Sequence, residues 1–94
     1  MEEKRMKALK LIVTGKVQGV FYRAQTQNQA KQLGIMGSVK NLPDGNVEVV
    51  AEGELESMIQ FVNWCHRGPL LAKVDKVFTE ELPVTGLKEF KIER

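Results

Sequence analysis

The chain has 94 residues, a length that accommodates one hydrophobic core, so a single domain is expected over residues 1–94. Hydrophobic residues form 43% and charged residues 28% of the chain, proportions that exclude a disordered or collagen-like protein. The 14 basic and 12 acidic residues leave a net charge of +2 and are scattered along the sequence, which argues against a surface for nucleic acid. Any anion that the protein binds is expected to be small.

The single cysteine, Cys65, excludes an internal disulfide and a metal site built from several thiolates, and it fits a reducing compartment. No apolar run approaches the roughly 20 residues that span a bilayer. The charged start of the chain is not followed by the long apolar segment of a signal peptide. We therefore expect a cytoplasmic protein without a membrane partner, and a monomer.

The first third of the chain predicts a strand and a helix on either side of a glycine-containing loop. After a polar lead-in expected to be frayed over residues 1–7, apolar residues alternate from Leu9 to Val13 and predict a strand over residues 8–14. Residues 24–33 predict a helix that ends at Gly34, the usual place for a helix C-terminal glycine. Its narrow apolar face consists of Tyr22, Thr26, Ala30 and Leu33.

The middle of the chain predicts a hairpin followed by a second helix. Residues 35–42 and 47–52 have strand patterns, and Pro43-Asp44-Gly45 between them has the residue types of a tight turn. A helix is expected to begin at Gly53-Glu54 and to end at Gly68-Pro69. Its predicted buried stripe consists of Leu55, Met58, Ile59, Val62 and Cys65.

The end of the chain supplies the last strands of the predicted sheet. A fourth strand is expected over residues 74–81, with charged residues along a solvated edge, and a short fifth strand contains Phe90 and Ile92. The order β-α-β-β-α-β with a terminal strand predicts an α+β, ferredoxin-like sandwich, in which two helices cover one face of a largely antiparallel sheet. The first and third strands of such a sheet are central neighbours, so the first and second strands can end at the same edge.

The loop from Gly15 to Arg23 is the first candidate site. Free backbone N–H groups and the positive end of the macrodipole favour an anion where a helix begins. Arg23 stands at the helix end where a cation opposes the macrodipole, so a bound anion explains this residue better than local stability does. A structural alternative stays open, in which Gly15 and Gly19 serve only a tight crossover turn.

Asn41 is the second candidate, because it ends the second predicted strand and can lie beside the loop. Its neutral amide can both donate and accept hydrogen bonds toward an anion held there. The alternative is that Asn41 only closes a strand before Pro43, since asparagine is common near turns.

Four residues of the second helix are expected to have packing or surface roles. Cys65 and His66 are adjacent in the helix, do not face one another and have no third ligand at a suitable spacing, so no metal site is predicted. Phe61 and Trp64 are expected to bury apolar area.

Two segments of this chain resemble the sequence motifs of the acylphosphatase family. They are Gly15-Lys16-Val17-Gln18-Gly19-Val20-Phe21-Tyr22-Arg23 and Gly37-Ser38-Val39-Lys40-Asn41-Leu42-Pro43-Asp44-Gly45-Asn46-Val47-Glu48. The resemblance extends from about Leu9 to Ile92, and Ser38 stands where some members carry a bulkier residue.

The resemblance implies the ferredoxin-like fold and an enzyme that hydrolyses the carboxyl-phosphate anhydride of small acyl phosphates, without a metal or other cofactor. It implies that Asn41 positions the attacking water and that Arg23 binds the phosphate. The loop amides implied to bind it as well are those of Gln18, Gly19, Val20, Phe21, Tyr22 and Arg23. Such a sparse site is chemically sufficient, because a carboxylate leaves without a general acid and phosphoryl transfer requires mainly positioning and charge stabilisation.

Two other classes of function stay open from the fold class alone. A nucleic-acid-binding domain of similar topology would carry aromatic residues on its exposed sheet face, and residues 47–52 include none. A non-catalytic module that only binds or senses an anion at the loop stays open, and phosphate binding without turnover would indicate it.

Overall fold

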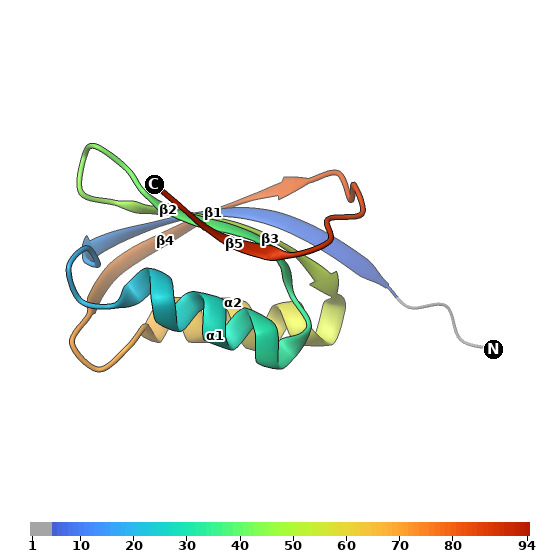
Figure 1. The fold of residues 1–94 in the computed structure, drawn as a ribbon, viewed down its shortest axis with the longest axis horizontal. Coiled ribbons are helices and arrows are strands. Elements are labelled where there is room, and N and C mark those ends of the chain that lie inside the picture. The colour runs from blue at the N-terminus through green and yellow to red at the C-terminus, as the bar shows by residue number, and fades with distance from the viewer. Residues whose placement is uncertain (1–4) are drawn as a thin grey trace.

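The structure, a computed structural model, describes residues 5–94. Two helices pack side by side against one face of a five-stranded sheet (Figure 1). In chain order the elements are β1 (Met6–Lys16), α1 (Tyr22–Leu33), β2 (Met36–Asn41), β3 (Val47–Glu54), α2 (Leu55–Arg67), β4 (Lys73–Leu82) and β5 (Phe90–Glu93). None of the helices within this described part is long and apolar enough to cross a membrane.

The strand order in the sheet is β4-β1-β3-β2-β5. β1 is antiparallel to β3 and β4, β2 is antiparallel to β3, and only β5 runs parallel to its neighbour, β2. This arrangement confirms the predicted ferredoxin-like fold and the adjacency of the first and third strands. Because β1 and β2 are both antiparallel to β3, they end at the same edge, where Figure 1 shows the β1–α1 loop and the β2–β3 hairpin at one end of the molecule.

Two predicted boundaries at the start of the chain are corrected by the structure. The frayed lead-in was wrong for Met6 and Lys7, which pair with Glu54 and Gly53 in the sheet, and residues 1–4 of that prediction lie outside the described residues. α1 begins at Tyr22 and not at residue 24, so its first turn includes Arg23. The two residues at this strand end are too few to form an apolar alternation, which is why the sequence pattern did not show that they are paired.

The core lies between the sheet and the helices. Inward residues of the central strands, such as Leu11, Val13 and Val49, are fully buried. α1 contributes Tyr22, Thr26 and Ala30 of its predicted face, and the fourth residue of that face, Leu33, is partly buried against the core.

The predicted stripe of α2 was wrong at Ile59, which is 53% exposed. The buried residues of this helix are Met58, Phe61, Trp64 and Cys65, so the packing role expected for Phe61 and Trp64 is confirmed. Successive helical residues are rotated by about 100°. A face centred near Phe61 and Cys65 therefore turns Ile59 toward solvent.

Candidate active site

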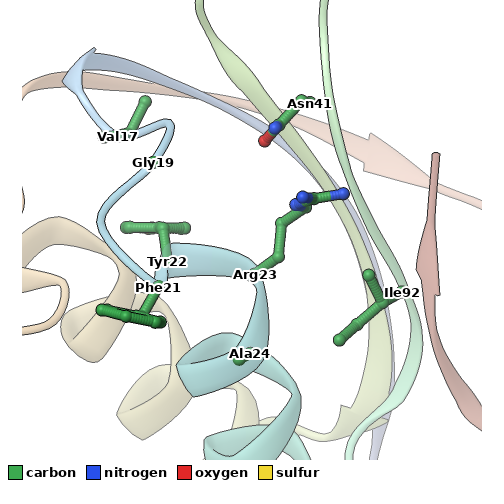
Figure 2. A pocket seen from close by; sticks show the side chains of 8 residues that line it. All are labelled: Val17, Gly19, Phe21, Tyr22, Arg23, Ala24, Asn41 and Ile92. Atoms are coloured by element: carbon green, nitrogen blue, oxygen red, sulfur yellow. The ribbon is translucent and has the colours of Figure 1, made fainter.

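A cavity of about 300 Å³ opens where β1 and β2 end and α1 begins (Figure 2). Its walls come from the β1–α1 loop, the first turn of α1, the last residue of β2 and one residue of β5. The lining residues are Val17, Gly19, Phe21, Tyr22, Arg23, Ala24, Asn41 and Ile92. The fold thus brings the two candidate side chains, Arg23 and Asn41, into one cavity.

The start of α1 lacks the groups that usually stabilise a helix N-terminus. Phe21, the preceding residue, has a left-handed φ of 66°, and no side chain caps the first turn. That turn also lacks an acidic residue, whereas α2 has Glu56 in the equivalent place. Within residues 5–94, the backbone N–H groups of residues 18–23 have no hydrogen-bond acceptor. The loop therefore gathers free donors and the positive end of a helix beside the cavity.

Arg23 is half-buried, and Figure 2 shows its side chain reaching from α1 toward β2. Its Nη1 donates a long hydrogen bond of 3.4 Å to the carbonyl oxygen of Glu93 in β5. Nearby, Nε2 of Gln27 donates to the carbonyl oxygen of Phe90 at 2.9 Å, so two α1 side chains contact the β5 backbone. A guanidinium has five N–H donors, so Arg23 can hold an anion without losing the contact to β5.

Asn41 is the last residue of β2 and pairs with Val47 across the hairpin. Its Oδ1 is buried and accepts no hydrogen bond from residues 5–94. In Figure 2 the Asn41 amide is turned toward the Arg23 guanidinium. A buried polar atom without a partner costs about 1–3 kcal/mol. Oδ1 of Asn41, a residue that lines the cavity, therefore has an unmet acceptor position that a donor such as water can satisfy.

Comparison with known proteins identifies the family. The family model "Acylphosphatase" matches residues 9–92. An acylphosphatase from Marinobacter nauticus is 56% identical over 75 residues, which cover 80% of this chain and 82% of that protein. The chain belongs to the acylphosphatase family. A second acylphosphatase, from Methylococcus capsulatus, is 49% identical and aligns over 95% of this chain and 98% of its own length.

A solved acylphosphatase structure from Coxiella burnetii matches with a TM-score of 0.92 at 38% identity, over 99% of this chain and 100% of that one. These similarities confirm the predicted family, the fold and the enzyme class, an acylphosphatase hydrolase.

The acylphosphatase motif residues do not all lie at the cavity surface. Gly19, Phe21, Tyr22 and Arg23 are among the lining residues, whereas Gln18 and Val20 are not. The Val20 side chain is 4% exposed and belongs to the hydrophobic core. The Gln18 side chain hydrogen-bonds the β2–β3 hairpin. For these two residues only the backbone amide is left to contact a substrate.

Three lining residues were not predicted for the acylphosphatase cavity, namely Val17, Ala24 and Ile92. Val17 lies inside the first acylphosphatase motif, between Gly15 and Arg23, so this motif could have indicated it as a cavity residue. Ile92 reaches the cavity because β5 pairs in parallel with β2, with Val39 opposite Ile92. No local pattern in the sequence indicates a pairing between segments so far apart in the chain.

The titratable residues near the core have packing roles. The Tyr22 hydroxyl donates to the carbonyl oxygen of Cys65 at 2.7 Å, and burial raises the pKa of Tyr22 far above its ordinary value. Burial also raises the pKa of the Cys65 thiol to about 12, so it is not a thiolate near neutral pH. His66 is exposed at the end of α2. Over the described range, 5–94, no three His, Cys, Asp or Glu side chains are grouped to hold a metal ion.

Proposed function

We propose that this cavity is where the acylphosphatase reaction takes place, converting a small acyl phosphate and water to a carboxylate and inorganic phosphate. The observation that carries the proposal is the meeting of Arg23, at an uncapped helix N-terminus, with the buried and unpaired Oδ1 of Asn41. The first feature suits a phosphoryl group, and the second suits the water that attacks it. Nucleic acids, membranes and cofactors have no part in the proposed reaction.

Arg23 and the amides of residues 18–23 bind the phosphoryl oxygens in this proposal. Each hydrogen bond to a charged group contributes about 1.5–3 kcal/mol, and the planar guanidinium can bind two oxygens at once. Phosphoryl transfer spreads negative charge over the equatorial oxygens, and fixed donors around that charge lower the barrier. The same groups therefore bind the substrate and stabilise its transition state.

Asn41 orients the water, with its Oδ1 accepting a hydrogen bond from it. As the bond from the water oxygen to phosphorus forms, the bond from phosphorus to the acyl oxygen breaks, and its electron pair leaves on the carboxylate. A carboxylate with an ordinary pKa near 4 needs no general acid to leave at neutral pH. Because a carboxamide is not a base, the proton of the water passes to a phosphate oxygen of the substrate.

The test of the proposed reaction is hydrolysis of benzoyl phosphate in the presence of excess chelator. We expect benzoate and phosphate to form at the rate seen without chelator. A loss of activity on chelation would contradict the reaction without metal. Phosphate binding without turnover would instead indicate a module that only binds anions.

The test of Asn41 is the Asn41→Ala variant, with Asn28→Ala on the exposed side of α1 as the matched control. We expect kcat to fall about 100-fold, because the attacking water is no longer oriented. The affinity for inorganic phosphate should hardly change, since Arg23 and the loop amides are intact. Full activity of Asn41→Ala would remove Asn41 from the mechanism.

We also propose that the protein is a monomer and that it acts in the cytoplasm, where a single free cysteine, Cys65, fits the reducing compartment. Sedimentation velocity measures the oligomeric state directly.

A further inference from the structure

Gln18 connects the two halves of the proposed site. Its side chain lies between the β1–α1 loop and the β2–β3 hairpin, where Nε2 donates to the carbonyl oxygens of Leu42 at 2.8 Å and Asn46 at 2.9 Å. The two hydrogens of an amide NH2 group match two acceptors, and the opposite amide orientation would place Oε1 against two carbonyl oxygens. The hydrogen bonding therefore fixes which way this side chain points.

The hairpin is already closed without Gln18. The Leu42 N–H donates to the Asn46 carbonyl oxygen at 2.8 Å, and the Gly45 N–H donates to the Leu42 carbonyl oxygen at 3.1 Å. Asp44 Oδ1 accepts from the Asn46 N–H at 3.0 Å. Each of these two carbonyl oxygens thus accepts one hydrogen bond from within the hairpin and a second one from Gln18. Removing it breaks the link to the loop and leaves the turn intact.

We propose that Gln18 is a positioning residue that sets the separation between the phosphate-binding loop and Asn41. Leu42, one of its two acceptors, directly follows Asn41 in the chain. Within residues 5–94, no other hydrogen bond joins residues 17–21 to residues 41–46. The inference rests on the proposed function, because it requires a phosphoryl group at the loop and a water at Asn41.

The reason that this separation matters is the geometry of in-line attack. The water at Asn41 must lie about 3–3.5 Å from the phosphorus held by the loop, and a misplacement of about 1 Å can cost about 100-fold in rate. Loss of the link should therefore impair the chemical step more than phosphate binding. A residue with only a structural role would change both together, or neither.

The experiment compares Gln18→Leu and Gln18→Glu with the control Gln32→Leu, whose side chain is exposed on α1. We expect Gln18→Leu to lower kcat by about 10- to 100-fold, while the dissociation constant of inorganic phosphate changes less than about threefold. Gln18→Glu, which keeps the shape but turns oxygens toward the two carbonyls, should lower kcat further. Thermal unfolding of each variant shows whether it is folded. If one Gln18 variant does not fold, the other alone can test the positioning role.

The same substitution in an Asn41→Ala background separates this inference from the proposed function. If Gln18 acts through Asn41, the loss of kcat caused by Gln18→Leu should largely disappear in that background. An undiminished loss there, an unchanged kcat in the single variants, or an equal loss of phosphate affinity would overturn the positioning role. If Asn41→Ala alone has full activity, the proposed function has failed first.

Discussion

Two loops of this protein offer consecutive backbone N–H groups to an anion, and they lie at opposite ends of the sheet (Figure 1). In the β4–β5 loop, the N–H groups of Thr85, Gly86 and Leu87 donate to the Glu52 carboxylate at 2.7, 2.9 and 2.8 Å. In the β1–α1 loop, the N–H groups of residues 18–23 have no acceptor within residues 5–94. Each loop contains a glycine of similar left-handed conformation, with φ of 81° at Gly86 and 74° at Gly19.

The difference shows that similar backbone donors are satisfied within the chain at one end of the sheet and left free at the other. Glu52 is 3% exposed, and hydrogen bonds from the loop, led by that from Thr85, lower its pKa although burial opposes this. The chain supplies its own anion there, and the loop is fastened over the sheet. At the β1–α1 loop the chain supplies Arg23, a cation, so an anion bound there would be a ligand.

The largest effect is expected from Arg23→Gln, which removes the charge that distinguishes the two loops. We expect kcat/KM for benzoyl phosphate to fall about 1,000-fold, because a fixed charged donor to the transition state is lost. Arg23→Lys should also be strongly impaired, since an ammonium cannot reproduce the guanidinium fork. Steady-state kinetics measures both, with Arg67→Gln at the exposed end of α2 as control.

Stability should respond to Arg23→Gln in the opposite direction from activity. Without phosphate, removing a cation from a helix N-terminus stabilises the helix by about 0.5 kcal/mol. Urea denaturation should therefore show Arg23→Gln to be at least as stable as the original chain. A large loss of stability would mean that Arg23 is a structural residue.

A smaller effect is expected from Glu52→Gln, which weakens the hydrogen bonds between the β4–β5 loop and residue 52. The free energy of unfolding should fall by about 3 kcal/mol at pH 7, because three N–H groups lose a charged acceptor and one faces an amide NH2 instead. Glu80→Gln, on exposed β4, is the control and should change stability by less than about 0.5 kcal/mol.

The effect of Glu52→Gln should depend on pH in a stated direction. Because the pKa of Glu52 is lowered in the folded protein, its stabilisation is fully present above the ordinary glutamate pKa of about 4.3. The stabilisation is lost as the pH falls below that value toward the folded pKa. Denaturation at several pH values should therefore show the variant and the original chain converging in acid, and a constant difference would contradict the role of the ionised carboxylate.

The smallest effect is expected from Gly19→Ala, with Gly34→Ala as a matched control. Both glycines have left-handed φ, 74° and 72°, and an added Cβ would meet nothing within 4 Å at either. Each variant should lose about 1 kcal/mol of stability from backbone strain alone. Only Gly19→Ala should also weaken phosphate binding, by a few-fold. Equal phosphate affinities, measured by calorimetry, would show that the loop conformation at Gly19 does not matter for binding.

The sequence predicted the proximity of Arg23 and Asn41, whereas it did not predict the hydrogen-bonded β4–β5 loop at the other end of the sheet. Pro43-Asp44-Gly45 and the helix ending at Gly34 are local signals, and they placed the hairpin and the end of α1 correctly. From those elements the topology brought Arg23 and Asn41 to one edge. Their roles in catalysis stay a prediction.

The features that were missed depend on contacts between distant segments. No local pattern in the sequence predicts the burial of Glu52, which depends on the contact of residues 85–87 with its carboxylate. Ile92 enters the cavity through the pairing of β5 with β2. Ile59 has the spacing of a buried residue, but the rotation of α2 on the sheet, which its sequence alone does not determine, exposes it.

The most direct test of the central claim is a titration of the isotope-labelled protein with inorganic phosphate, followed by the amide signals in NMR. We expect saturable shifts for the amides of residues 18–23 and none for Thr85, Gly86 and Leu87, whose donors are already bound to Glu52. We also expect Arg23→Gln to weaken the binding greatly. Saturable shifts confined to other parts of the chain, with residues 18–23 unaffected, would contradict the assignment of the β1–α1 loop as the phosphate site.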